Sequence, residues 1–277
     1  PKLRGRYRSR PMEDILTEAR ALAADGVREC IVIAQDITRY GMDLYHEKKL
    51  PQLLRELCKL DFHWIRLHYL YPDTITDELI DTIAAEPKIC KYIDMPIQHC
   101  NDTILKAMRR RETHAGLLAL MDKLRSRIPG VVLRTSLITG LPYEDEAAFD
   151  ELCEFLRRTH IERAGVFPYS PEEGTAAAEM PNRVDTAEAE RRAELVVDVQ
   201  SRVMDAFNES RMGDLVEVLC DGFDPQSMQY MGRSYGESPD VDGHIYFTSD
   251  ADVNPGDFVM VRITGAMDGE LVGEREE

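Results

Sequence analysis

Polar residues recur at the ends of five short apolar runs in the sequence, where they could bind a ligand or transfer a proton. These run ends are Gln35-Asp36, His68 with Tyr71, Gln98-His99, Arg134 to Gly140, and Tyr169. Histidine titrates near neutral pH and can serve as an acid, a base or a ligand, although a lone histidine is more often a hydrogen-bonded structural residue. Loops at strand ends are also polar in any protein. The residues alone therefore give a ligand site and ordinary turns equal weight.

Arg134 is the most informative of these residues because it interrupts an otherwise apolar run at 131–140. A guanidinium cannot lose its charge, so a buried one needs a carboxylate or phosphate partner. One interpretation is a structural ion pair with a sheet neighbour such as Asp94, and the other is a clamp on a ligand carboxylate. Gly140 ends the run, where a residue without a Cβ permits either a tight turn or the close approach of a ligand.

Cysteine spacing gives no sign of a metal centre. None of the six cysteines forms a CxxC pair, and scattered thiols of this kind are typical of reduced, mostly buried residues in a cytosolic protein. Ser-His-Asp order, a Walker loop and HExxH are absent as well. We therefore predict no metal ligands within this chain. The cysteines are Cys30, Cys58, Cys90, Cys100, Cys153 and Cys220.

Short apolar runs alternate with amphipathic stretches from residue 11 to about 210. The runs are rich in β-branched and aromatic residues and predict strands, whereas apolar spacings of three and four predict helices between them. Strand–helix alternation implies parallel βα units, so we predict an α/β fold with a partial TIM-like barrel; a doubly wound sheet is the competing architecture. The predicted strands are 29–35, 64–71, 92–99, 131–140 and 163–170, and the helices are 12–25, 50–60, 76–85, 113–127 and 144–159.

The character of the sequence changes near residue 211. A long helix is predicted over 185–212, led by the capping residue Asp185, and short strands follow at 215–220, 244–247 and 258–263. Turn-rich short strands at this spacing predict a small antiparallel β-barrel. We therefore predict two domains, 1–210 and 211–277.

Charge separates the two parts further. The chain carries 34 Lys and Arg against 51 Asp and Glu, a net charge of −17, and residues 211–277 hold 15 acidic and 4 basic residues, a net of −11. Such a surface repels polyanions and favours a basic partner. The longest apolar runs are far shorter than a membrane span, and no secretion signal opens the sequence. These features exclude a membrane protein, a disulfide-rich secreted domain and a typical RNA binder, and they favour a cytoplasmic location.

Segments spread over the whole chain together resemble the radical S-adenosylmethionine (radical SAM) methylthiotransferases. The C-terminal part is similar to the TRAM domain of the same family. The segments are PKLRGRYRSRP at 1–11, QD at 35–36 with YG at 40–41, RLHY at 66–69 with YP at 71–72, DMPIQH at 94–99, LKAMRR at 105–110, GLP at 140–142 with Asp145, and YSPEEGT at 169–175.

Within the family the sequence is most similar to the RimO branch, which methylthiolates the β-carbon of an aspartate in small ribosomal subunit protein twelve. His99-Cys100 stands where enzymes of the tRNA-modifying MiaB branch typically show Ser-Gly, and the segments 232–234 and 238–243 resemble the RimO form of the TRAM domain. The −11 charge independently favours a Lys/Arg-rich protein over tRNA. The alternatives are a tRNA adenosine methylthiotransferase and a non-catalytic acidic scaffold that binds proteins.

The resemblance also implies cofactors and partners. The family uses S-adenosylmethionine and two [4Fe–4S] clusters, and its CxxxCxxC loop lies immediately before the segment at 1–11, which places the cluster region upstream of Pro1. We therefore expect this chain to be a fragment that lacks the N-terminal domain and the cluster ligands and is inactive by itself, with its catalytic residues unknown. The expected partners are the basic ribosomal protein and a reductant protein, with neither a membrane nor tRNA.

The resemblance implies a set of cofactor-binding residues, and the strand ends together with the acidic C-terminal domain give a set of predicted substrate-binding residues. Many relatives have GFPGET where this chain has GLPYED, and Tyr143 lacks the backbone freedom of glycine, so the loop geometry of those relatives is not carried over. The cofactor-binding set is Gln35, Asp36, Gln98, Arg134, Gly140 and Leu141. The substrate-binding set is His68, Tyr71, His99, Tyr169, Asp240 and Asp242.

Overall fold

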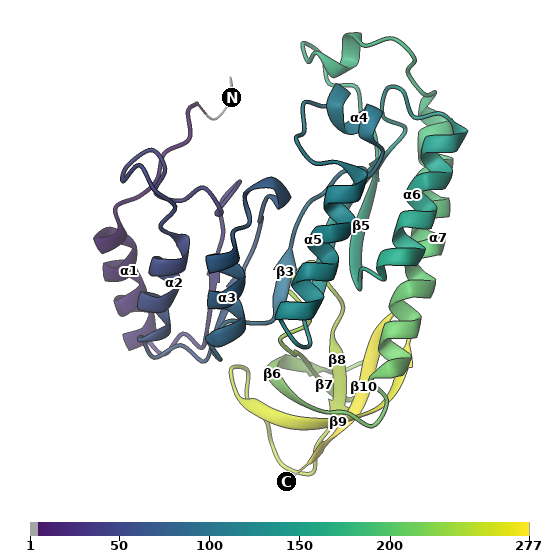
Figure 1. The fold of residues 1–277 in the computed structure, drawn as a ribbon. Helices are drawn as coiled ribbons and strands as arrows, with labels where there is room; N and C mark the ends of the chain where they lie inside the picture. Colours follow the sequence, from purple (N-terminus) through teal and green to yellow (C-terminus); the bar gives the residue numbers. More distant parts are fainter. Residues whose placement is uncertain (1–4, 277) are drawn as a thin grey trace. The chain divides into compact units, whose positions relative to one another are not determined.

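The computed structural model describes residues 5–276 and divides the chain into two compact units. The first unit holds residues up to 96 together with 119–131, and the second holds 97–118 together with 132–277. Figure 1 shows alternating helices and strands followed by a barrel at the C-terminus.

The start of the family-like segment at 1–11 is not covered by this description. Pro1, Lys2, Leu3 and Arg4 lie outside the described residues. The cluster region expected upstream of Pro1 stays a prediction.

The first unit is built from parallel βα repeats. Strands β1 and β2 pair in parallel from Glu29 opposite Trp64 to Val32 opposite Leu67. The helix α2 is strongly amphipathic and begins with a proline in its first turn, and Leu53, Leu54 and Leu57 form its buried face. The elements of this unit are α1 (Met12–Ala24), β1 (Glu29–Val32), α2 (Leu50–Cys58), β2 (Trp64–Leu67), η1 (Pro72–Thr74), α3 (Asp77–Ala85) and β3 (Tyr92–Asp94).

The second unit continues the alternation and then forms the barrel. Strands β4 and β5 pair in parallel from Arg134 opposite Arg163 to Thr139 opposite Pro168. The helix α5 (His114–Arg127) begins in this unit and ends in the first. The other elements before the barrel are α4 (Asp102–Ala107), β4 (Val132–Thr139), α6 (Glu146–Thr159), β5 (Arg163–Pro168), η2 (Ala177–Glu179) and α7 (Thr186–Ser210).

The helix α7 packs against β4, β5 and α6. Asp185 caps its N-terminus by accepting a hydrogen bond from the Ala187 N–H, as the sequence predicts. The first turn of α7 approaches the end of β4 closely because Gly140, the residue that follows β4, has no Cβ. A Cβ added to Gly140 would lie 2.2 Å from the Ala189 Cβ. The Thr139 hydroxyl donates to the Ala189 carbonyl at 3.0 Å. Gly140 is therefore required by helix packing, a reason that the sequence does not reveal.

The C-terminal strands close into a five-stranded barrel in the order β10-β8-β7-β6-β9. The pairs are antiparallel except β8 with β10, which is parallel, so the predicted antiparallel barrel is correct for four of the five pairs. The parallel pair arises because β10 turns back from β9 as a hairpin and then meets the edge of β8. The strands are β6 (Leu215–Asp224), β7 (Gln229–Arg233), β8 (Ile245–Thr248), β9 (Phe258–Met267) and β10 (Glu270–Glu276).

The predicted fold class is confirmed, and the predicted helices and strands occur at nearly the predicted places. Five elements were missed: the short helix α4, the 3-10 turns η1 and η2, and the strands β7 and β10, which contain glycine and polar residues. The proposed boundary at 210/211 falls between α7 and β6, both of which belong to the second unit, and it remains a prediction. No helix within residues 5–276 is long and apolar enough to cross a bilayer.

The contact between Gly140 and Ala189 gives a stability prediction. Gly140→Ala should lower the free energy of unfolding by about 3 kcal/mol, since it adds a left-handed backbone penalty (φ +75°) to a steric clash. Gly174 has the same φ of +75° but nothing within 4 Å of an added Cβ, so Gly174→Ala should cost only about 1 kcal/mol. Urea unfolding of the two variants measures the difference. Equal losses would contradict the packing argument.

Candidate functional site

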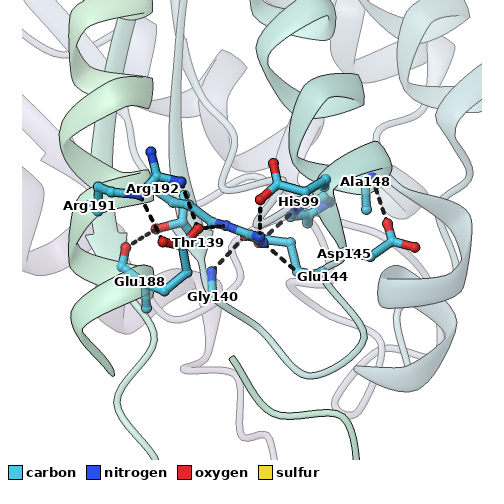
Figure 2. Close-up of polar contacts among 11 residues, drawn as sticks. His99, Thr139, Gly140, Glu144, Asp145, Ala148, Glu188, Arg191 and Arg192 are labelled. Atoms are coloured by element: carbon cyan, nitrogen blue, oxygen red, sulfur yellow. Dashed lines mark hydrogen bonds and ion pairs between the residues drawn. The ribbon is translucent and has the colours of Figure 1, made fainter. Parts of the chain in front are cut away.

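A buried carboxylate lies at the carboxyl end of β4. Glu144 Oε1 accepts hydrogen bonds from the Gly140 N–H at 2.9 Å and from Arg192 Nη1 at 3.0 Å, and Arg192 Nη1 also donates to the Glu144 carbonyl at 2.8 Å. The other oxygen, Oε2, lies 3.3 Å from His99 Nε2. Figure 2 shows Glu144 between His99 and Arg192. We call these four residues, His99, Gly140, Glu144 and Arg192, the Glu144 network.

The network keeps Glu144 ionised although its side chain is fully buried. Burial by itself would raise the pKa of this carboxyl group, but the contacts with His99, the Gly140 N–H and Arg192 outweigh it, and the net pKa lies below the usual 4.5. A buried charge of this kind is stable only when its partners are in place. Glu144 therefore fixes the loop after β4 to α7.

His99 contributes one defined tautomer to the network. The Asn101 N–H donates to His99 Nδ1 at 3.0 Å, so Nδ1 is the unprotonated nitrogen and Nε2 carries the hydrogen that faces Glu144. The side chain has no exposed surface. His99 thus links the segment that follows β3 to the loop that follows β4.

The loop after β4 has a tyrosine, Tyr143, in a backbone conformation that glycine usually adopts. Tyr143 has φ +71°, in the left-handed region, and its N–H donates to the Asn182 carbonyl at 3.0 Å. Its ring packs on the buried cluster that contains Leu141. Asp145 then caps α6 by accepting a hydrogen bond from the Ala148 N–H at 2.9 Å. The loop therefore accommodates tyrosine where many relatives have glycine.

Four buried polar atoms beside the end of β4 have no hydrogen-bond partner in the described part of the chain. Two of them, His99 Nε2 and Glu144 Oε2, face each other at 3.3 Å, and the other two are Gln98 Oε1 and the Tyr169 hydroxyl. Gln98 lies opposite Leu137 of β4 with φ +74°, and the Tyr169 N–H donates to the Thr139 carbonyl at 2.8 Å. An unpaired buried polar atom costs free energy unless a ligand or water satisfies it. Gln98 Oε1 and the Tyr169 hydroxyl therefore point to a ligand position at this strand end.

Arg134 has a carboxylate partner within the second unit. Its Nε lies 3.7 Å from Asp242 Oδ1, and both side chains are largely buried. Asp242 Oδ2 also accepts a hydrogen bond from the Ser238 N–H at 2.9 Å. Arg134 thus forms an ion pair with Asp242. The suggested pair with Asp94 remains a prediction. A role for Arg134 on a ligand carboxylate remains a prediction.

The acidic residues predicted to meet the substrate differ in accessibility. Asp240 is exposed, whereas the Asp242 side chain is only 5% exposed and is held by Arg134 and the Ser238 N–H. Asp250 and Asp252 are exposed on the same barrel. Substrate contact by Asp240 and Asp242 remains a prediction.

The first unit holds four of the predicted site residues. Gln35 is exposed after β1, and the Asp36 carboxylate accepts a hydrogen bond from the Thr38 N–H at 2.9 Å. Burial raises the pKa of Asp36 in spite of that bond. His68 is buried with Nδ1 3.6 Å from Asp94 Oδ2, and the Tyr71 carbonyl accepts from the Thr74 N–H. Their roles remain predictions.

Sequence reasoning missed the two charged residues that organise the loop after β4. Neither residue has a role predicted from the sequence: Glu144 is the first residue of the predicted helix 144–159, and Arg192 lies within the predicted helix 185–212. The two are 48 positions apart. No periodicity marks either residue as buried, because each lies among charged neighbours.

Two protein-family models match different parts of the chain. The Radical SAM superfamily model matches residues 1–156, more than half of the chain. The chain belongs to the radical SAM superfamily. A TRAM domain model matches residues 212–275 of this radical SAM protein, which contain the barrel.

Curated relatives extend over nearly all of this radical SAM chain. It is 47% identical over 275 residues to "Ribosomal protein uS12 methylthiotransferase RimO" of Caldanaerobacter subterraneus subsp. tengcongensis, covering 99% of this chain and 62% of that protein. It is 46% identical to the protein of the same name from Myxococcus xanthus, covering 98% and 57%. The chain thus spans about three fifths of the length of these relatives.

A solved structure supports the radical SAM fold. The Escherichia coli coproporphyrinogen III oxidase HemN, described as a radical SAM enzyme, superposes with a TM-score of 0.52 at 13% identity. The match covers 81% of this chain and 58% of HemN. At this identity the similarity concerns the fold alone.

The Glu144 network gives a second stability prediction. Glu144→Gln should lower the free energy of unfolding by about 3 kcal/mol near neutral pH, because it leaves Arg192 without its buried counter-charge. Glu146 contacts the same guanidinium at 3.2 Å but is 73% exposed, so Glu146→Gln should cost less than about 0.5 kcal/mol. Chemical unfolding of both variants makes the comparison.

The stability difference between the natural protein and Glu144→Gln should depend on pH. Folding lowers the pKa of the Glu144 carboxyl group. Its ionised form therefore contributes fully to the free energy of unfolding above pH 4.5, and this contribution is lost as the pH falls below 4.5 through the folded-state pKa. The stability difference between the natural protein and Glu144→Gln should therefore shrink on acidification. A difference that stays constant from about pH 6 to pH 3 would show that Glu144 is not the titrating group.

Proposed function

We propose that the protein containing this chain is a radical SAM methylthiotransferase that modifies the β-carbon of an aspartate in ribosomal protein uS12. The observation that carries the proposal is an identity of 42–47% over 98–100% of the chain to proteins named as uS12 methylthiotransferases. This similarity runs through both the radical SAM region and the TRAM domain.

The proposed cofactors are S-adenosylmethionine and [4Fe–4S] clusters, two in the complete protein. Together they supply a radical able to take a hydrogen atom from an unactivated carbon. The six cysteines of this chain do not fit a cluster: the one convergent group of potential metal ligands in residues 5–276 contains a single cysteine. We therefore propose that the cluster ligands belong to sequence upstream of Pro1 and that this chain alone does not cleave the cofactor.

The proposed S-adenosylmethionine site uses the side-chain amide oxygen of Gln98 as its best-supported contact. Gln98 Oε1 is a buried acceptor without a partner in the described residues, which suits a ribose hydroxyl. The Glu144 network holds the neighbouring loop, so the backbone at Gly140 and Leu141 is rigid where it would meet the adenine. We further propose Gln35 and Asp36 for the methionine amino group and Arg134 for the carboxylate.

The proposed substrate surface combines strand-end residues with the acidic barrel. His68, Tyr71, His99 and Tyr169 are the proposed residues near the reacting aspartate, of which Tyr169 has a buried hydroxyl without a partner in the described residues. His99 is fully buried and engaged, so it would act by positioning its neighbours. Asp240 would attract the basic protein from the surface and Asp242 from within its ion pair.

The deciding experiment uses the complete gene with its upstream sequence. Anaerobically reconstituted and reduced protein should add one methylthio group to an aspartate of uS12, detected by mass spectrometry of the tryptic peptides. The 277-residue chain is the inactive comparison, and a reductant protein partner is expected. Modification of tRNA adenosine instead would support the rival branch, and an iron-free protein without cofactor cleavage would support the scaffold. The proposed location is the cytoplasm.

The acidic barrel gives a binding prediction that does not need catalysis. Asp250→Lys with Asp252→Lys should slow association of this chain with uS12 about tenfold at low salt, because complementary charge steers encounter. The control is Asp25→Lys with Asp61→Lys, which makes the same change of charge at exposed turns of the first unit. Surface plasmon resonance at low and high salt compares the two. Equal slowing by both pairs would mean that only net charge matters.

A further inference from the structure

We propose that Cys100, His114 and Glu151 form a site for a divalent transition-metal ion, with Zn²⁺ as the best-suited metal. One ligand atom from each residue lies within 4.8 Å of the other two. The group lies outside the Glu144 network and takes part in none of the contacts assigned to the proposed reaction. The inference does not rest on the proposed function.

Three separate elements bring the ligands together within the second unit. Cys100 lies in the segment before α4, His114 is the first residue of α5, and Glu151 lies on the second turn of α6. A thiolate, an imidazole and a carboxylate are the three kinds of ligand that Zn²⁺ accepts in proteins. Because they come from different elements, a bound ion would join the three segments.

The distances suit an ion after small side-chain movements. His114 Nδ1 lies 2.7 Å from Glu151 Oε1, yet this buried nitrogen makes no hydrogen bond within the described residues. Zinc ligands lie roughly 2.0–2.3 Å from the ion, so two ligands of one tetrahedral ion are roughly 3.2–3.7 Å apart. The imidazole and the carboxylate therefore need to separate by about 1 Å or less, which a change of side-chain torsion supplies.

The surrounding residues already orient two of the ligands. Asn101 Nδ2 donates to Glu151 Oε2 at 2.6 Å, and this leaves Oε1 directed to His114. The His114 backbone N–H donates to Asp102 Oδ1 at 2.6 Å, and its ring packs edge-on against Phe155. Such outer contacts fix the orientation of metal ligands in proteins.

Burial and charge explain why Cys100 needs the ion to become a thiolate. The residue is completely buried, and burial together with the nearby Glu151 charge raises the pKa of its thiol. A divalent cation supplies the opposite charge and displaces the proton. His114 and Glu151 keep 27% and 34% of their side-chain surface exposed, so water can reach the ion as a fourth ligand. Three protein ligands and one water make a complete tetrahedral set.

The site has a structural consequence because Cys100 directly follows His99. An ion that holds Cys100 to α5 and α6 would restrict the segment that places Gln98 and His99. Metal binding should therefore stabilise the second unit.

The test is titration of the tag-free 277-residue chain with ZnCl₂ and CoCl₂ in the presence of a phosphine reductant. We expect one Zn²⁺ per chain by calorimetry and a higher thermal unfolding midpoint with the ion. Co²⁺ should give visible bands of a tetrahedral site and a near-ultraviolet sulfur-to-metal charge-transfer band. Cys100→Ala should abolish that band and weaken Zn²⁺ binding about 100-fold, and Glu151→Gln should weaken it about tenfold.

The matched control is Cys220→Ala, which removes another buried thiol in the same unit and should leave metal binding unchanged. Circular dichroism of each variant establishes that it folds. If Cys100→Ala does not fold, the charge-transfer band of the unmutated chain still reports thiolate ligation. Absence of binding, absence of that band, or equal losses in the Cys100 and Cys220 variants would overturn the proposal.

Discussion

A single buried carboxylate, Glu144, holds the carboxyl end of β4 in place. It receives a backbone N–H from Gly140, a guanidinium from Arg192 on α7 and the imidazole of His99, so three segments distant in sequence meet at one charge. A buried ion pair is not a large source of stability, but removing one partner leaves the other uncompensated. The geometry of the strand end is therefore specified by electrostatics as much as by packing.

Packing at Gly140 acts together with this charge. Helix α7 approaches β4 so closely that a Cβ at Gly140 would overlap Ala189. The close approach brings Arg192, about one turn further along α7, to Glu144. The same strand end carries Gln98 Oε1 and the Tyr169 hydroxyl, which have no partner in the described residues. A rigid loop beside unsatisfied polar atoms is the arrangement that a preorganised ligand site requires.

Three of the four basic residues at 211–277 form ion pairs with acids of the same segment, and other acids of the barrel are exposed. Arg211 contacts Glu237, Arg233 contacts Asp221, and Arg262 contacts Glu276. Exposed acids such as Asp250 and Asp252 therefore add to an uncompensated negative surface. A surface of this kind affects the rate of encounter with a basic protein more than the strength of the final complex.

The sequence by itself determined the alternation of strands and helices, the change to a barrel near residue 211 and the excess of negative charge. These features are local, since they follow from apolar periodicity, turn residues and composition. It also pointed to Arg134, Gln98 and His99, because polar residues at strand ends stand out from apolar runs.

Only the tertiary structure decided that Glu144 and Arg192 are buried partners, that Gly140 faces Ala189, and that Arg134 pairs with Asp242. It also placed the three residues of the proposed metal site together. Those contacts join residues far apart in the chain, and no local pattern encodes which distant charge or side chain will meet another.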